Sequence, residues 1–361
     1  MFFITLFKKI SYIIIFTCFF ISCRTKNLSK NSTATANSNQ TTNQTTLENQ
    51  TDLASPADNS KETDQENQNN QTKLADTSNE KSSKNQKSRK AAPEKLEIFQ
   101  KAYPDIIFTP EWDSEKEDWK ITMDLGTKKS VLYWNNGSML PESELKNKEK
   151  YWTLLYHYDY KKPLADPADF TQEEIEAMKN FGSDENRKNG AGTPMFFFDE
   201  IYDSHTRASL EKHIVGVNFL GFKVNVHERL VEPLKKVEEK INQAAKESQE
   251  VSDFVKSISK NEGYFWRVIV NTNRKSFHSL GIAIDIRPKS YKGKEVYWSW
   301  AKDKNPESWM LTPLKDRWMP PQKVIDIFED QGFIWGGKWG IWDNMHFEYH
   351  PELIYNAKAE E

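Results

Sequence analysis

Two short stretches near the C-terminal end carry histidines and carboxylates whose spacing suits the binding of a metal ion. The stretch SFHSLGIAIDI contains His278 and Asp285, seven positions apart, and the stretch WDNMHFEY contains Asp343 and His346, three positions apart. A catalytic zinc site uses three protein ligands and keeps a fourth position open for water. Two histidines and one carboxylate would supply that ligand set, and the second carboxylate could act as a general base.

The first of these stretches, residues 276–286, is predicted to be a β-strand. Read at a period of two, Gly281, Ala283 and Asp285 face one side, and the three isoleucines between and after them face the other. The isoleucines would pack in a core, whereas the small residues would leave space beside the carboxylate. The pattern therefore indicates a strand that carries a metal-binding acid.

The second stretch is predicted to be a strand over residues 345–349, with Asp343 at its start. His346 and Glu348 share one face of this strand, and Phe347 and Tyr349 share the other. The polar face would point to the same site as Asp285, and the aromatic face would point to the core.

The rest of the chain after residue 94 holds most of the aromatic residues and is expected to form the folded body. A helix over 227–247 is indicated by leucine, valine and isoleucine residues at helical spacing, which favours core packing over a functional role. The single histidines His205, His213 and His227 are expected to be surface or hydrogen-bonded residues and not ligands. The other predicted elements are hairpins over 118–140, a capped helix over 171–181, a loop over 184–193, a helix over 204–215, a strand over 265–270, a long insertion over 287–319, a helix that begins at 320–321 and a strand over 333–335.

Composition narrows the classes of function. The net charge is −3 and no basic block occurs, so nothing indicates a partner nucleic acid. The two cysteines, Cys18 and Cys23, both lie at the N-terminus, so the folded body can have neither a disulfide nor a thiolate metal site. Any transition metal there must be held by histidine, aspartate or glutamate.

The N-terminal part is predicted to place the body outside the cytoplasm. Residues 1–22 have two lysines followed by a short apolar run, as in a signal peptide, and the sequence FISC that ends at Cys23 resembles a bacterial lipobox. Cys23 would then be the lipid anchor to a bacterial membrane, with the body facing the periplasm; an ordinary secretory signal with an incidental cysteine is the alternative. Residues 23–94 are polar and contain no Phe, Trp or Tyr, which predicts a disordered tether.

The two metal-binding stretches resemble the motifs of a known enzyme family. S-x-H-x-x-G-x-A-x-D followed by G-G-x-W and D-x-x-H-F-E is similar to the VanY-type D-alanyl-D-alanine carboxypeptidases, a zinc peptidase family that also includes L-alanyl-D-glutamate endopeptidases. The resemblance covers about residues 220–352. It implies an α+β fold, a small antiparallel sheet with flanking helices as in hedgehog-type peptidase domains. Residues 201–361 would form this domain, and residues 95–200 would be a β-rich N-terminal extension without a counterpart in the family.

The resemblance also implies a role for each polar residue of the motifs. His278, Asp285 and His346 would be the ligands of one zinc ion, and Asp343 would be the general base. Many D,D-peptidases of the family have glutamate at the place of Asp343, so aspartate resembles the endopeptidase branch more closely.

Residues around the ligands would support catalysis. Arg267 matches the arginine that the family places before the first ligand, where it would polarise the scissile carbonyl and stabilise the oxyanion; Arg274 is the weaker candidate. Ser276 and Glu348 would orient the ligands.

The predicted substrate is the stem peptide of peptidoglycan, hydrolysed at a D-alanyl-D-alanine bond. Two alternatives remain: an endopeptidase of the same family, and a zinc-containing cell-wall-binding lipoprotein without activity. A third, a structural protein with two buried histidines and no metal, is the least favoured.

Overall fold

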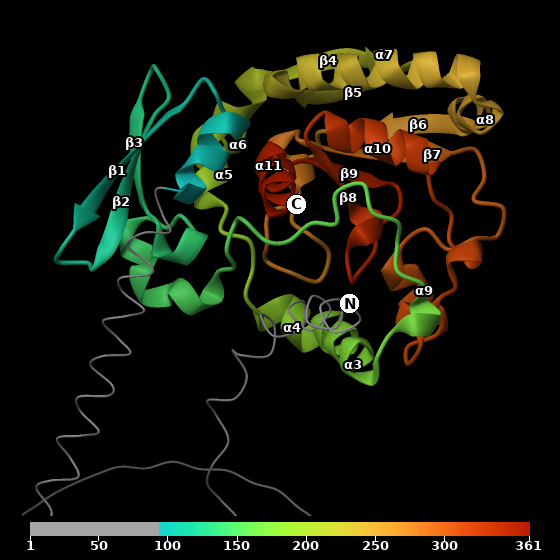
Figure 1. The fold of residues 1–361 in the computed structure, drawn as a ribbon, viewed down its shortest axis with the longest axis horizontal. Coiled ribbons are helices and arrows are strands. Elements are labelled where there is room, and N and C mark those ends of the chain that lie inside the picture. Colours follow the sequence, from blue (N-terminus) through green and yellow to red (C-terminus); the bar gives the residue numbers. More distant parts are fainter. Residues whose placement is uncertain (1–93) are drawn as a thin grey trace, which may run out of the picture. The chain divides into compact units, whose positions relative to one another are not determined.

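A computed structural model describes residues 94–361, and the predicted signal peptide, Cys23 and tether lie outside the described residues. The described part is an α+β structure with three small antiparallel sheets and surrounding helices, as the fold prediction required (Figure 1). None of its helices combines the length and the apolar character that crossing a bilayer requires.

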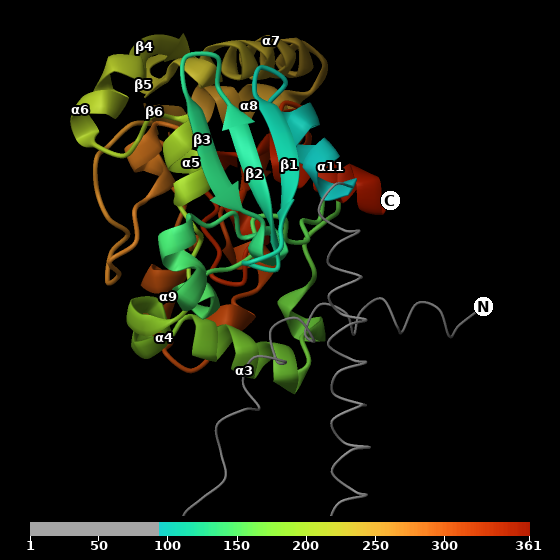
Figure 2. The ribbon, with the colours of Figure 1, turned by 90° about the vertical axis from the view of Figure 1, so that its left-hand side faces the viewer.

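The N-terminal sheet has three strands, β1 (Ile107–Asp113), β2 (Asp118–Asp124) and β3 (Lys129–Tyr133), in the order β1-β2-β3. Alternate residues of β2 point inward, which buries Ile121 and Met123 completely. The predicted hairpin over 118–140 is thus confirmed, whereas β1 was not anticipated. Figure 2 shows this sheet face-on with the helix over 94–102 beside it.

Short helices follow the sheet. These are α3 (Gln172–Phe181), α4 (Asp184–Asn189), α5 (Phe196–Ile201) and α6 (Arg207–Leu210). The capping box that Thr171 and Glu174 were expected to form is present at the start of α3. The β structure of the predicted extension is therefore confined to 107–133, and the rest of it is helical or irregular.

Two of the predictions in this region are wrong. The polar stretch 184–193 was predicted to be a loop, but Ser183 accepts a hydrogen bond from the Asn186 amide and starts α4. The predicted helix over 204–215 ends after α6 and one further turn, because β4 (Ile214–Phe219) begins there and pairs with β5 (Phe222–His227).

Helix α7 (Val231–Glu247) confirms the longest predicted helix, and its buried face is the expected apolar stripe. Helix α8 (Gln249–Ser257) follows directly. Helix α7 contacts both β4 and α10 (Gln322–Asp330), so it joins the β4–β5 hairpin to the C-terminal part of the structure (Figure 1).

The C-terminal sheet has the order β6-β7-β9-β8 and is entirely antiparallel. Helix α10 and strands β8 and β9 were predicted, whereas β6 and α11 were not. The elements are β6 (Ile258–Glu262), β7 (Ala283–Pro288), α10 (Gln322–Asp330), β8 (Phe333–Trp335), β9 (His346–Tyr349) and α11 (Pro351–Glu360).

Two other strand predictions need correction. No strand forms over 265–270, where the described backbone has only an isolated bridge between Val268 and Lys275. The predicted strand over 276–286 begins only at Ala283, since residues 277–280 form a 3-10 turn and Gly281 adopts a φ of 70°. The three isoleucines after that turn are nevertheless fully buried, as expected.

The insertion over 287–319 folds around aromatic side chains of its own. Helix α9 (Trp298–Lys304) lies in it, and Trp298, Trp309 and Met310 form a buried cluster with Trp342. The cluster ties the insertion to the loop that precedes β9.

One hydrophobic core crosses the predicted boundary at residue 200. Phe99 and Phe197 of the N-terminal part belong to the same buried cluster as Ile284 of β7 and Phe347 of β9. The strands that carry the candidate ligands therefore share one hydrophobic core with the extension.

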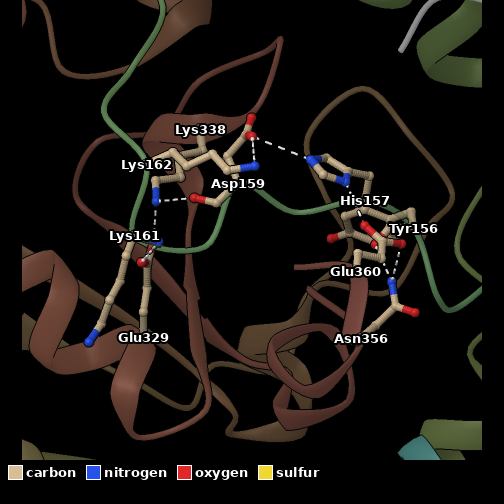
Figure 3. Close-up of polar contacts among 9 residues, drawn as sticks. All are labelled: Tyr156, His157, Asp159, Lys161, Lys162, Glu329, Lys338, Asn356 and Glu360. Atoms are coloured by element: carbon tan, nitrogen blue, oxygen red, sulfur yellow. Dashed lines mark hydrogen bonds and ion pairs between the residues drawn. The ribbon is translucent and has the colours of Figure 1, made fainter. Parts of the chain in front are cut away.

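Residues 156–162 of the extension cross the C-terminal part and are fixed there by polar contacts (Figure 3). The Lys161 amide donates to Glu329 Oε2 at 2.7 Å, and Lys338 Nζ donates both to Glu329 Oε1 and to the Asp159 carbonyl. Glu329 is fully buried, so this ion pair is a fixed connection between the extension, α10 and the turn after β8.

Candidate metal centre

The pairing of β7 with β9 places two of the three predicted ligands side by side. Asp285 is directly opposite His346 in the antiparallel register, and Asp285 Oδ1 lies 2.7 Å from His346 Nδ1. Cross-strand partners share one face of a sheet, so the predicted inward face of both strands is confirmed.

The third predicted ligand reaches the same point from the 3-10 turn over Phe277–Leu280. Ser276 Oγ accepts a hydrogen bond from the His278 amide and caps this turn. Gly281 ends it in a left-handed conformation, and a Cβ there would lie 2.7 Å from the His227 amide nitrogen. The glycine of the motif is thus required by backbone geometry, and not by space beside Asp285 as predicted.

Each histidine ring has one nitrogen fixed by an acceptor and the other directed at the site. His278 Nδ1 lies 2.7 Å from the Gly263 carbonyl, and His346 Nε2 lies 2.8 Å from Glu348 Oε1. This arrangement is typical of metal-binding histidines, because the outer hydrogen bond selects the tautomer and the ring orientation.

The three side chains fit a metal ion. One ligand atom from each of His278, Asp285 and His346 lies within 4.8 Å of the others. His278 Nε2 is buried and forms no hydrogen bond with any described residue, although it lies 3.2 Å from Asp285 Oδ1. A buried polar atom without a hydrogen bond is costly, and a cation bound among the three groups would satisfy it.

The charges around the site also suit a cation. Burial opposes ionisation of Asp285, but the neighbouring His278 and His346 outweigh it and hold the pKa of that carboxyl well below its usual range. Burial likewise opposes ionisation of Glu348, but hydrogen bonds from His346 and His350 lower its pKa to about 2. Both carboxylates are therefore ionised at neutral pH.

Asp343 lies beside this group in a different electrostatic state. Burial and the charge of Asp285 raise the pKa of Asp343 to about 7, and its Oδ1 has no hydrogen-bond partner among the described residues. The Asp343 amide donates to the Gly336 carbonyl. The two residues are in close contact, because a Cβ added to Gly336 would lie 2.7 Å from the Asp343 carbonyl oxygen. A carboxyl with a pKa near 7 can both accept and return a proton at neutral pH.

The two arginines considered from the sequence lie in different surroundings. Arg267 is exposed on the irregular segment before Ser276, and its backbone is held by Ser279 Oγ, which accepts from the Arg267 amide at 2.8 Å. Arg274 donates to the carbonyls of Asn186 and Gly190, which fixes it to the end of α4. Arg267 is thus the more exposed of the two arginines.

Three residues near the ligands were missed in the sequence. Tyr297 of the insertion forms a β-bridge with Asp343, and the charges of Asp343 and Arg267 both act on its phenol. His350 and Glu352 continue the polar row that begins at His346 and Glu348. The alternation H-F-E-Y-H-P-E could have indicated His350 and Glu352, whereas the insertion carries no comparable signal for Tyr297.

Two parts of the chain match known protein families. Residues 270–349 match the family described as D-alanyl-D-alanine carboxypeptidase, which supports the relationship to VanY-type peptidases and hence a hydrolase that acts on peptides. Residues 95–155 match a family described as a domain of unknown function (DUF8518). No curated protein and no solved structure matches the chain.

Proposed function

We propose that this chain is a zinc-dependent peptidase that hydrolyses the stem peptides of peptidoglycan at a D-alanyl-D-alanine bond. The observation that carries the proposal is the convergence of His278, Asp285 and His346 inside the segment that matches a carboxypeptidase family. Nitrogen and oxygen ligands from two histidines and one carboxylate are those of catalytic zinc sites.

The three converging side chains would hold the ion, and the remaining chemistry would fall to their neighbours. When bound, zinc would act as a Lewis acid on the scissile carbonyl and on the attacking water. Asp343 would take a proton from that water and return it to the leaving amine, a role that its pKa of about 7 supports. Arg267 would stabilise the negative charge that develops on the carbonyl oxygen.

Hydrolysis inside the stem peptide is the second candidate. The base position is occupied by Asp343, as in the endopeptidase branch that the motif resembles, whereas many D,D-carboxypeptidases have glutamate there. The same three candidate ligands would serve both activities, so the product is what distinguishes them.

The proposed substrate agrees with the proposed location. A lipid on Cys23 would keep the body at a bacterial membrane, outside the cytoplasm, where peptidoglycan is found. Labelling with a radioactive fatty acid should then mark the full-length chain, and the Cys23→Ser variant should remain unlabelled.

The activity is tested by incubating the metal-loaded protein with purified muropeptides and identifying the products by mass spectrometry. Loss of one terminal alanine indicates a carboxypeptidase, and internal fragments indicate an endopeptidase. The matched control is Asp343→Asn, which should abolish turnover while the protein keeps its metal. Intact muropeptides with the wild-type protein, or full activity of Asp343→Asn, would refute the proposal.

A further inference from the structure

A buried row of hydrogen bonds leads from the candidate ligand His346 to the N-terminal extension. His346 Nε2 contacts Glu348 Oε1 at 2.8 Å, and Glu348 Oε2 contacts His350 Nε2 at 3.1 Å. His350 Nδ1 contacts Glu352 Oε1 at 2.7 Å, and the Tyr103 hydroxyl donates to Glu352 Oε2 at 2.7 Å. Every polar atom along the row has a partner.

The row lies in the interior. Tyr103, His350 and Glu352 are each at most 3% exposed. The His350 ring is packed edge-on against Phe198 of α5 and Phe277 of the turn that carries His278, with ring centroids 5.3 and 4.6 Å away. The extension therefore contributes both an apolar wall, through Phe198, and the last donor of the row, through Tyr103.

The charges along the row alternate. Burial disfavours a charged His350, but the carboxylates of Glu352 and Glu348 on its two sides raise its pKa to about 9. His350 is then a cation that donates from both ring nitrogens, which leaves Glu348 free to accept from His346. Removing one member would leave a buried charge with one hydrogen bond fewer.

We propose that Tyr103 and Glu352, acting through His350 and Glu348, are positioning residues for the metal ligand His346. The segment matched to a domain of unknown function would on this view complete the metal site and not form a separate module. The proposal rests on the proposed function, because it assigns the row to the same metal centre.

A purely structural role would give a different result from positioning. A buried ionic row contributes little net stability compared with an apolar packing of the same volume. Outer hydrogen bonds to metal-binding histidines, in contrast, change metal affinity by about 10- to 100-fold when they are lost. Metal affinity and unfolding free energy therefore separate the two roles.

The test uses Tyr103→Phe in the full chain, which removes the terminal donor and little volume. Zinc affinity is measured by competition with a chromophoric chelator, and the site geometry by the visible spectrum of the Co²⁺-substituted protein. We expect zinc affinity to fall about threefold to tenfold, with a shifted Co²⁺ spectrum. Glu352→Gln should cause a larger loss of the same kind and serves if Tyr103→Phe does not fold.

The matched control is Tyr158→Phe. Tyr158 is also buried and donates to a buried carboxylate, Glu329 Oε1 at 2.6 Å, but no row of side-chain hydrogen bonds among the described residues leads from this pair to His346. Chemical unfolding of the metal-free proteins should show comparable losses of stability for the two tyrosine variants. Only Tyr103→Phe should change zinc affinity.

The outcomes distinguish this inference from the proposed function. If the wild-type protein binds zinc and both Tyr103→Phe and Glu352→Gln bind it equally well, the positioning role is refuted and the peptidase proposal stands. If Tyr158→Phe weakens zinc binding as much as Tyr103→Phe, general destabilisation explains the effect and the positioning role is also refuted. A wild-type protein that binds no zinc would refute the proposed function itself.

Discussion

The segment over 270–349 and the extension over 94–200 contribute to the candidate site in different ways. All three candidate ligands and the candidate base lie in the first segment, which matches a peptidase family. The second contributes no candidate ligand, but it shares a hydrophobic core with the strands that carry them and ends the polar row behind His346. The candidate ligands thus lie within one matched segment, whereas part of their support comes from another region of the chain.

The difference shows which part of a site depends on long-range structure. His346 and Glu348 are two residues apart on one strand, but Tyr103 and Glu352 are separated by 249 positions and Tyr158 and Glu329 by 171. Replacements in the first segment should therefore affect metal binding directly, and replacements in the extension should act through stability or orientation. The four predictions below are ordered by expected effect.

Asp285→Asn should have the largest effect, since it removes the charged ligand and keeps the side-chain shape. Apparent zinc-binding free energies of about 10–16 kcal/mol for four ligands correspond to about 2.5–4 kcal/mol for one, a loss of about a hundredfold to a thousandfold in affinity. The measurement is competition with a chelator. His213→Asn, which replaces a half-buried histidine paired with Glu228 outside the site, is the control and should bind zinc normally.

Lys338→Met should be the most destabilising change between the two regions. It leaves the fully buried Glu329 without its cation, and breaking a buried pair in this way costs about 3–5 kcal/mol. Urea unfolding measures the loss. Lys161→Met, whose ammonium pairs with Asp330 at the surface, should cost less than about 1 kcal/mol; equal losses for the two variants would show that the buried pair adds nothing.

The pH dependence of stability should depend on His227, which lies where the β4–β5 hairpin meets Gly281. Burial, with the charges of His213 and Arg229, lowers the pKa of His227 to about 4. As the pH is lowered from 6.5 to 4, the unfolded chain gains a proton that the native protein does not. The free energy of unfolding therefore decreases by about 3 kcal/mol over this range.

His227 Nδ1 accepts a hydrogen bond from the Arg229 amide at 3.2 Å. The variant His227→Asn has an asparagine that can also accept this bond but cannot titrate. Its free energy of unfolding should therefore fall less steeply than that of the wild-type protein between pH 7 and pH 4. Identical pH profiles for the two proteins would mean that His227 is not buried in its neutral form.

Asp105→Asn should have the smallest effect. Arg229 donates to both oxygens of Asp105, at 3.1 and 2.7 Å, and so ties the extension to the turn before α7. Asp105 is more than half exposed, and pairs of this kind contribute about 1 kcal/mol or less. A loss above about 2 kcal/mol in thermal unfolding would show that surface contacts, and not the buried row and core, join the two regions.

Periodic segments were predictable from the sequence. Helices α7 and α10 and strand β9 have regular apolar faces, and α3 has a local capping box, so each was recognised from its own residues. Two of the three candidate ligands were recognised for the same reason, because Asp285 and His346 lie on the polar faces of alternating strands, whereas His278 lies on a 3-10 turn that was predicted to be a strand.

The errors occurred where distant residues decide the structure. Residues 265–270 are mostly apolar and were predicted to be a strand, but Phe265, Val268 and Val270 are exposed. Their backbone is held by Ser279 Oγ and by backbone hydrogen bonds to residues 272–278. Helix α4 is polar on all sides and depends on Arg274, 84 positions away, to bind its last carbonyls. No local pattern specifies such contacts.

The central claim is that three side chains form one metal site, and elemental analysis tests it most directly. The wild-type protein, purified and dialysed against zinc-free buffer after loading, should retain about one zinc ion per chain, and His278→Ala should retain almost none while unfolding cooperatively. Equal zinc content in the two proteins, or none in the wild-type protein, would contradict the account.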